Sequence, residues 1–351
     1  MYDFSFHRQL VNWYKKGCRV LPWRENSDPY RIWLSEIMLQ QTQVSTVIEY
    51  FNRFIKSYPN IEALNQANEE DVFKLWEGLG YYSRARNLLR CAKTIAEEYN
   101  GIFPKDLQKL KKLPGIGPYT AGAIMSIAYN EPVPAVDGNV MRVISRYRML
   151  EINISDTKNR SVFEEEVMAL MGGAPREFNQ ALMELGATIC TPKQPKCLDC
   201  PVKEGCKAFK NGTAEQYPVK LKKAQKKVVK MAIIILEHQE RIMIVKRPNT
   251  GLMANLWGFP AVPYTDELLE LTVNQYMKDE FDLEVIIREL EEGPKHIFTH
   301  LIWEMQLVKC SLKNTKDTIK PIEFPEIQWV RREQLKEYAF PTAFRKLFSM
   351  L

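Results

Sequence analysis

The sequence predicts a two-domain protein in which an all-α domain is followed by an α+β domain. Three observations lead to this prediction. The chain has 351 residues, which is long for one compact domain. Apolar residues recur at helical spacing up to about residue 210, with Pro and Gly between the runs. After residue 231 the pattern changes to short alternating or continuous apolar runs, which are typical of strands.

These patterns place the elements and the boundaries. We predict a helical domain over 1–216, a solvated linker with six lysines over 217–230, and an α+β domain over 231–351. Helical runs are expected over 32–58, 72–79, 88–99, 117–128, 140–147, 161–171 and 178–190. Strands are expected over 231–238, 241–248, 284–290, 300–310 and 326–332, with a helix over 266–278 and a short helix near the end.

Composition narrows the class of partner. The net charge of +6 and the pI near 8.8 favour a polyanionic partner, although mildly basic proteins of other kinds are common. No apolar run approaches the roughly 20 residues that span a bilayer, and the first ten residues resemble neither a signal peptide nor a transit peptide. We therefore expect no membrane association, and a cytoplasmic, DNA-associated location if the source is bacterial.

Four of the seven cysteines lie within seventeen residues, in the spacing Cys-x6-Cys-x2-Cys-x5-Cys: Cys190, Cys197, Cys200 and Cys206. Four thiolates in one short loop can hold either a zinc ion or a [4Fe-4S] cluster. The first gap of six residues is too wide for a paired zinc knuckle, so the spacing favours iron-sulfur. Lysines between these cysteines suit contacts with phosphate, and they would also simply keep the loop soluble.

A second motif joins two helices. Gly115 and Gly117 form a tight turn, and Pro118 occupies the favoured first position of the next helix. Glycines at the turn leave backbone N–H groups uncovered at a helix N-terminus, which suits an anion such as a DNA phosphate. Turns of this kind also join helices without any ligand.

Two carboxylates complete the candidate chemistry. Asp28 and Pro29 predict a helix start, and Glu36 falls on the apolar face of that helix, where burial would raise its pKa. Asp137 precedes the apolar run from Val140 as a helix N-cap, so we expect helix N–H groups to hold it ionised. A protonated acid beside an anion is the division of roles used in glycosidic cleavage. The simpler alternatives are that Glu36 is a rim glutamate or a paired buried one, and that Asp137 only caps its helix.

The motifs together resemble adenine DNA glycosylases of the MutY type, in the helix-hairpin-helix superfamily. The resemblance rests on segments 21–44, 78–88, 113–124 and 136–143, the cysteine loop, and segments 257–260 and 296–303. It therefore runs along nearly the whole chain. The first segment is highly specific, whereas the hairpin and the cysteine loop are shared with endonuclease III-like relatives.

The resemblance implies a role for each matching residue. Glu36 would protonate adenine at N7 and then activate water, and Asp137 would stabilise the sugar cation or bond to it transiently. Tyr119 and Asn139 would lie beside Asp137. The adenine would be flipped out of the duplex and contacted by Trp23, Arg24 and Gln180. Gln41 and Tyr81 lie in segments that, in the family, enter the duplex near the opposite base. The other DNA contacts would be Arg84, Arg86, Gly115 and Gly117.

The resemblance also implies whether the enzyme cleaves the DNA strand and which domain recognises the oxidised base. Bifunctional relatives carry a lysine nucleophile where this chain has Tyr119, so a monofunctional enzyme is expected. The second domain resembles a Nudix fold, but no metal-binding glutamate helix appears between Gly258 and Glu280. It would instead recognise 8-oxoguanine through residues Phe298, Thr299 and His300. Relatives commonly have Ser in place of Thr299.

These observations predict a monomeric base-excision-repair glycosylase that acts on adenine opposite 8-oxoguanine, or guanine, in duplex DNA. One alternative is an endonuclease III-like glycosylase for another base, such as a mispaired thymine or an oxidised pyrimidine. A second is an 8-oxo-nucleotide diphosphatase, for which the metal-binding helix is missing. A third is a non-catalytic iron-sulfur module that only binds DNA.

Overall fold

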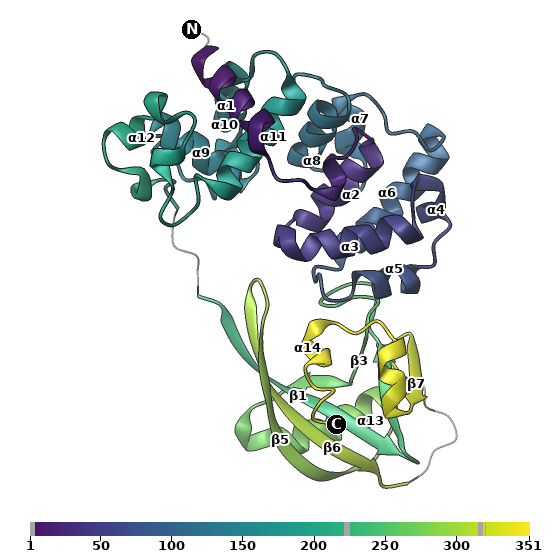
Figure 1. The fold of residues 1–351 in the computed structure, drawn as a ribbon. Coiled ribbons are helices and arrows are strands. Elements are labelled where there is room, and N and C mark those ends of the chain that lie inside the picture. Colours follow the sequence, from purple (N-terminus) through teal and green to yellow (C-terminus); the bar gives the residue numbers. More distant parts are fainter. Residues whose placement is uncertain (1–3, 221–224, 315–318, 320) are drawn as a thin grey trace. The chain divides into compact units, whose positions relative to one another are not determined.

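The computed structural model describes residues 4–220, 225–314, 319 and 321–351. The chain divides into two compact units (Figure 1). The first comprises Met1–Ala67 and Ser83–Lys223, and the second comprises Asn68–Tyr82 and Ala224–Leu351. Within the described ranges, no helix has both the length and the apolar character needed to cross a membrane.

The first unit is helical, as the sequence predicts, and its described residues contain no strand. Its helices are α1 (Phe4–Gly17), α2 (Pro29–Leu39), α3 (Val44–Ser57), α4 (Ile61–Asn65), α6 (Ser83–Tyr99), α7 (Leu107–Lys112), α8 (Pro118–Ala123), α9 (Gly138–Arg148), α10 (Arg160–Met171), α11 (Pro175–Thr188) and α12 (Lys207–Lys210). A π-helical turn continues α8 over Ile124–Ala128. The run expected over 32–58 is two helices because Gln41, in the loop between them, has a φ of 60°.

The helices that carry the two candidate carboxylates begin where the sequence predicts. The Asp28 side chain accepts a hydrogen bond from the Tyr30 amide at the start of α2. The Asp137 side chain accepts one from the Val140 amide at the start of α9. Pro118 is the first residue of α8. These caps satisfy N–H groups that a helix start otherwise leaves without a partner.

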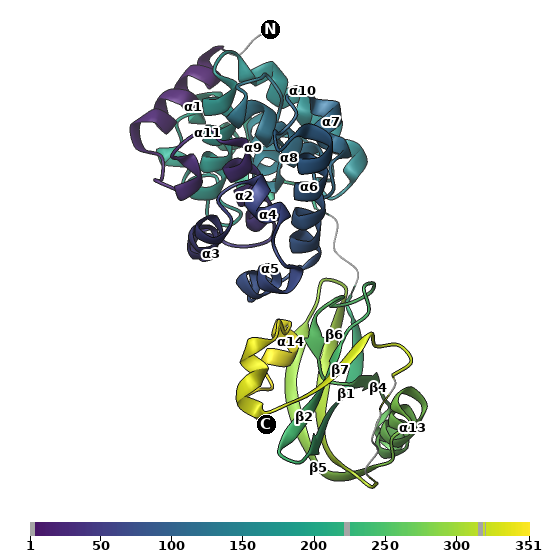
Figure 2. The same cartoon turned by 90° about the vertical axis from the view of Figure 1, so that its right-hand side faces the viewer.

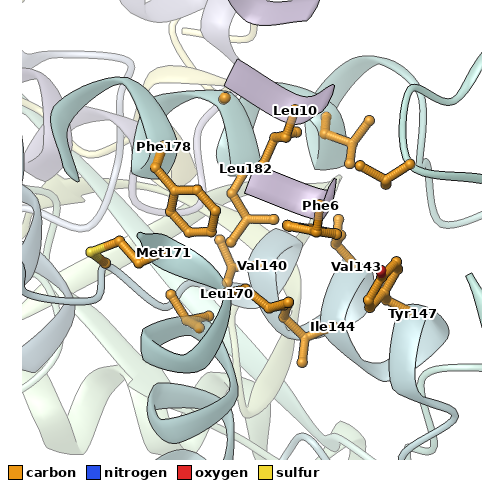
Figure 3. Packing of buried hydrophobic residues seen from close by; sticks show 14 of the residues in the cluster. Phe6, Leu10, Val140, Val143, Ile144, Tyr147, Leu170, Met171, Phe178 and Leu182 are labelled. Carbon is orange, nitrogen blue, oxygen red and sulfur yellow. The ribbon is translucent and has the colours of Figure 1, made fainter. Parts of the chain in front are cut away.

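One apolar core holds α9 in place. Phe6 and Leu10 of α1 face Phe178 and Leu182 of α11, and the Phe6 ring lies edge-on against Tyr147 at 4.6 Å between centroids (Figure 3). The α9 residues in this cluster are Val140, Val143, Ile144 and Tyr147. Because these side chains are buried, α9 is fixed along its length, and so is Asp137 at its start.

The second unit is built on a sheet, and its described strands are seven: β1 (Lys227–His238), β2 (Arg241–Lys246), β3 (Trp257–Gly258), β4 (Ala261–Pro263), β5 (Val285–Ile297), β6 (Leu301–Leu312) and β7 (Glu326–Val330). The strand order is β3-β2-β1-β6-β5, with β4 paired to β1 and β7 paired to β2. Strands β1 and β6 are parallel, and the other pairs are antiparallel. The two short strands β3 and β4 were not predicted.

Helices cover both faces of this sheet. Helix α13 (Leu269–Phe281) packs on one face and α14 (Thr342–Arg345) on the other (Figure 2). In β1, Ile233 and Ile235 join the core beneath α14, whereas Ala232 and Ile234 join the core beneath α13. A strand buried on both faces reads as a continuous apolar run, which explains the sequence of β1.

The observed boundaries differ from the predicted ones in two places. Residues 227–230, expected in the linker, form the start of β1, and 221–224 lie outside the described residues. Segment Asn68–Tyr82, which contains α5 (Glu69–Trp76), groups with the second unit instead of the first. Within that unit the Glu70 carboxylate lies 2.6 Å from Lys246 Nζ. Sequence periodicity carries no information about such long-range pairing.

Candidate active site

A cavity of about 760 Å³ opens in the helical unit, within the size range of ligand pockets. It brings together all four predicted catalytic residues: Glu36 from α2, Tyr119 from α8, and Asp137 and Asn139 from the start of α9. Six other predicted residues also line it: Trp23, Arg24, Gln41, Gly115, Gly117 and Gln180. Predicted residues up to 157 positions apart in sequence, from Trp23 to Gln180, therefore share one site.

Glu36 is the buried acid of this cavity. Its side chain is only 6% exposed, and burial raises its pKa from 4.5 to about 7. The Tyr119 hydroxyl donates a hydrogen bond to Glu36 Oε2, which opposes that rise. The negative charge of Asp137 adds to the rise. Glu36 is therefore partly protonated near neutral pH.

Asp137 is held by hydrogen bonds from both sides of its carboxylate. The Val140 amide donates to Oδ1 at 2.8 Å, and Asn139 Nδ2 donates to Oδ2 at 2.9 Å. Even so, burial raises the pKa of Asp137 above its ordinary value. The hydrogen bonds lower the pKa, as expected for a carboxylate that a helix start holds ionised, but removal of water outweighs them in the net shift.

Arg142, which was not predicted as a site residue, is buried behind this pair. Its Nη2 donates to Asn139 Oδ1 and to the Gly186 carbonyl, and its Nε donates to the Cys190 carbonyl, each at 2.8 Å. The Asn139 amide is thereby oriented with its nitrogen towards Asp137. A basic residue three positions after Asn139 on the same helix was the available signal.

A second buried carboxylate, Glu184, also lines the cavity and was not predicted. Arg19 binds it through two hydrogen bonds of 2.6 and 2.9 Å, and Arg24 Nη2 donates to it at 2.8 Å. Gln180 accepts a hydrogen bond from the Tyr14 hydroxyl at 3.1 Å. Arg24 and Gln180, the predicted adenine contacts, are therefore positioned by protein partners before any ligand binds.

The predicted DNA contacts fall into different environments. Gln41 is exposed at the rim of the cavity, and Tyr81, in the segment that groups with the second unit, is 46% exposed. Arg86 is half-buried. Arg84 is a correction: it is 7% exposed and donates to the carbonyls of α2 and of the loop that follows it. Its guanidinium is thus bound inside the protein.

The hairpin has the predicted form. Gly115 has a φ of 76°, which favours glycine, and a Cβ there would lie 2.7 Å from Asn87 Cβ. Gly117 is the N-cap of α8, and both glycines are exposed. The turn therefore presents uncovered backbone at a helix start, next to the cavity that both residues line.

The four clustered cysteines all line one small cavity of about 30 Å³: Cys190, Cys197, Cys200 and Cys206. Burial raises the pKa of the Cys200 thiol to about 12, and the other three sulfurs add to that rise. Arg146, almost fully buried, anchors the loop through the carbonyls of Thr191 and Pro192 and lies 3.3 Å from Cys190 Sγ. Convergent thiols that repel one another once ionised suit a cationic centre.

This donor set fits an iron-sulfur group by its chemistry, since four thiolates are the usual ligands of a [4Fe-4S] cluster. As they stand, no three His, Cys, Asp or Glu side chains in the described parts of the chain are arranged around a single metal ion. The fit therefore rests on the identity of the four donors and on their shared cavity.

The residues predicted to recognise 8-oxoguanine lie at the turn between β5 and β6. The Phe298 ring lies edge-on against His296 at 4.5 Å and against Trp303 at 5.0 Å. Thr299 and His300 are exposed at the tip of the turn. Packing fixes the aromatic ring, and it leaves the two polar side chains in contact with solvent.

Two family models match the chain. A model described as HhH-GPD superfamily base excision DNA repair protein matches residues 34–168, and a NUDIX domain model matches residues 231–350. The prediction of a helix-hairpin-helix glycosylase fold followed by a Nudix-like α+β domain is thereby confirmed.

Several relatives named adenine DNA glycosylase cover most of the chain. The Buchnera aphidicola subsp. Baizongia pistaciae protein is 39% identical over 77% of each chain. The human protein is 32% identical over 99% of this chain and 74% of its own. The Arabidopsis thaliana protein is 37% identical over 96% of this chain, which spans 63% of that relative.

The chain belongs to the adenine DNA glycosylase family. The prediction of a base-excision-repair glycosylase, a hydrolase of N-glycosyl bonds, is confirmed at this level.

Solved structures agree with the glycosylase fold of the helical unit. A thermostable thymine-DNA glycosylase matches with a TM-score of 0.53 and 30% identity, over 59% of this chain and 95% of that chain. An endonuclease III bound non-covalently to DNA matches with a TM-score of 0.50 over 58% and 94%. At 22% identity, the second match shows the fold alone.

Proposed function

We propose that this chain hydrolyses the N-glycosyl bond of adenine paired with 8-oxoguanine or guanine in duplex DNA and leaves an intact abasic site. The observation that carries the proposal is the pair of carboxylates in one cavity, with Glu36 partly protonated near neutral pH and Asp137 held as the N-cap of α9. Family membership supports adenine as the base removed.

Glu36 supplies the proton for the leaving base. With a pKa of about 7 it is partly protonated at neutral pH, and Tyr119 occupies its Oε2, so the proton is available at Oε1. Protonation of adenine at N7 lets the bond between C1′ and N9 break, with the electron pair staying on the base. The ionised Glu36 then takes a proton from the water that adds to C1′.

Asp137 stabilises the positive charge that develops on the sugar. The hydrogen bonds from Val140 and Asn139 hold its carboxylate in one orientation, and Arg142 fixes Asn139. Because these groups are in place before the substrate enters, no reorganisation is required when the bond breaks. The carboxylate acts here as a fixed anion or bonds transiently to C1′.

Extrusion of the adenine from the duplex is required, since C1′ and N7 cannot be reached together inside the stack. The polar wall of the cavity supports contacts from Arg24 and Gln180 to the base edge, with Trp23 beside them. Arg24 is held by Glu184, and Gln180 by Tyr14. We assign base selection to this wall.

Strand cleavage by a lyase step is not expected. Such a step needs an amine that forms a Schiff base with C1′. Of the described residues that line the cavity, none is a lysine. Tyr119, at the position of the lyase lysine, is bonded to Glu36, and burial raises its pKa well above the ordinary value, so it remains a neutral phenol.

The four cysteines are assigned to a [4Fe-4S] cluster, which would stiffen the loop when bound. The lysines of that loop would then face the DNA backbone together with the hairpin glycines. We expect the purified protein, as a monomer, to contain iron and acid-labile sulfide in equal amounts, about four of each per chain. Zinc without sulfide would contradict the assignment.

Recognition of 8-oxoguanine is assigned to Phe298, Thr299 and His300 of the second unit. The Thr299 hydroxyl and the His300 ring are exposed polar groups at a turn whose aromatic residue is fixed by packing. A hydroxyl both donates and accepts hydrogen bonds, which suits the altered edge of an oxidised purine.

A single-turnover assay tests the proposal. Duplexes carry adenine opposite 8-oxoguanine, guanine or thymine, and each reaction is divided into samples with and without alkali. We expect strand breaks only after alkali, fastest opposite 8-oxoguanine, then guanine, then thymine. No break after alkali on the first duplex would refute the proposal, and breaks without alkali would refute its monofunctional part.

A further inference from the structure

The C-terminal end of α2 is held by a side chain from another helix. Helix α2 ends at Leu39, and the last carbonyls of a helix have no intrahelical partner. Arg84, near the start of α6, reaches three carbonyls at this end through Nη1: Ile37 at 2.8 Å, Met38 at 2.8 Å and Gln40 at 2.6 Å. A permanent cation at a helix C-terminus is also favoured by the helix dipole.

The same guanidinium holds the loop that follows α2. Arg84 Nη2 lies 3.3 Å from Thr42 Oγ1, so its contacts extend on both sides of Gln41. Gln41 has a φ of 60°, a left-handed conformation that costs a non-glycine residue energy unless its surroundings impose it. The anchors at Gln40 and Thr42 supply those surroundings.

Arg84 therefore connects two parts of the site. Glu36 lies one turn before the end of α2, on the helix that Arg84 caps, and Gln41 lies at the rim of the same cavity. Arg84 itself is 7% exposed. A side chain this deeply buried and bonded to carbonyls is placed to fix backbone, not to contact a phosphate.

We infer that Arg84 is a positioning residue that fixes the 40–42 loop and the end of the helix bearing Glu36, so that Gln41 enters the duplex in one conformation. The inference deepens the proposed function and rests on that function, because the role of Gln41 in DNA binding depends on it. The link between Arg84 and the loop itself is independent of any activity.

Hydrogen exchange without DNA tests that link. In Arg84→Met, amides of the peptide spanning residues 37–43 should exchange about tenfold faster or more, because three carbonyl contacts are lost. Arg90→Met, an exposed position on the same helix, is the matched control and should leave this peptide unchanged. Unchanged exchange in folded Arg84→Met would overturn the inference.

Binding and excision on duplex DNA test the consequence. We expect Arg84→Met to lower the single-turnover excision rate about 10- to 100-fold, with the salt dependence of DNA affinity unchanged. Loss of a phosphate contact would instead reduce the slope of log affinity against log salt by about 0.9. That reduction, or a normal excision rate, would overturn the inference.

Arg84→Lys keeps the test decisive if Arg84→Met does not fold. Lysine keeps the charge but cannot present the planar fork that reaches three carbonyls. We expect Arg84→Lys to retain fast exchange in the 37–43 peptide and slow excision, whereas full rescue by lysine would indicate a phosphate contact and overturn the inference. If the unaltered protein removed no adenine, the proposed function would fail while the exchange result still decided the link.

Discussion

The cavity of the helical unit and the β5–β6 turn of the second unit use polar side chains in opposite ways. Glu36 lies in a buried site, where loss of water raises its pKa to about 7. Thr299 and His300 are exposed. Proton transfer at neutral pH requires a shifted pKa and therefore burial, whereas recognition of a base edge requires only accessible donors and acceptors. We expect substitutions to have large effects on rate in the cavity and small effects on selectivity at the turn.

The largest expected effect follows from removal of the acid. Glu36→Gln keeps the size of the side chain but cannot protonate the base, so the single-turnover rate of adenine release should fall about 10³-fold or more. In the unaltered protein the rate should decrease as pH rises through about 7, because the active form of Glu36 is protonated. The measurement is single-turnover excision between pH 5.5 and 9.

Glu98→Gln is the matched control for that measurement. Glu98 is exposed on α6, away from the cavity, and the substitution should change neither the rate nor its pH dependence. Full excision by Glu36→Gln would remove Glu36 from the mechanism and leave DNA binding as the simplest role of the chain.

Loss of the fixed anion should have the next largest effect. Asp137→Asn keeps an N-cap, since Asn caps helices as well as Asp does, but it removes the charge that faces the sugar cation. Excision should slow about 10²- to 10³-fold with little change in the melting temperature. Asp156→Asn is the control, because Asp156 caps a 3-10 turn through Lys158 N and is exposed. A large drop in melting temperature for Asp137→Asn would mean that its role is structural.

Burial of Glu36 should also make the free energy of unfolding depend on pH. Its pKa is raised from 4.5 to about 7 in the folded protein, so the folded state binds the proton more tightly than the unfolded state. Stability from this group is present below pH 4.5 and is lost as pH rises through about 7. The loss amounts to about 3 kcal/mol. Glutamine carries no charge at any of these pH values and avoids this loss.

Urea denaturation of Glu36→Gln and of the unaltered protein at pH 5 and pH 8 measures this difference. The variant should gain stability over the unaltered protein between the two pH values, and Glu98→Gln should not. An equal difference at both pH values would show that Glu36 titrates normally and is not the acid of the cavity.

The sequence predicted local features of this cavity well and long-range ones poorly. The caps at Asp28 and Asp137 depend on neighbouring residues, so they were predictable and are present. The net rise in the pKa of Asp137 depends on what surrounds it in space, which the sequence does not show. Glu184 was missed for the same reason, since its partner Arg19 lies 165 positions away.

Arg84 illustrates the limit of residue-by-residue transfer from a family. Its position in a matching segment suggested a DNA contact, and its burial at the end of α2 contradicts that. In the second unit the main strands were predictable from apolar patterning. The grouping of Asn68–Tyr82 with that unit was not, because salt bridges such as that between Glu70 and Lys246 have no local pattern.

The smallest effect is expected at the β5–β6 turn. It distinguishes recognition of 8-oxoguanine from catalysis of adenine release. Thr299→Val keeps the shape of the side chain but removes the hydroxyl, whereas Thr299→Ser keeps the hydroxyl. One hydrogen bond is worth about 1 kcal/mol, so Thr299→Val should reduce the preference for adenine opposite 8-oxoguanine over guanine about 5- to 10-fold. Thr299→Ser should retain it. The rate opposite guanine should stay unchanged in both, because the cavity is intact. If Thr299→Val slowed both duplexes equally, the turn would act in general DNA binding, and the contrast between a buried catalytic site and an exposed reading site would not hold.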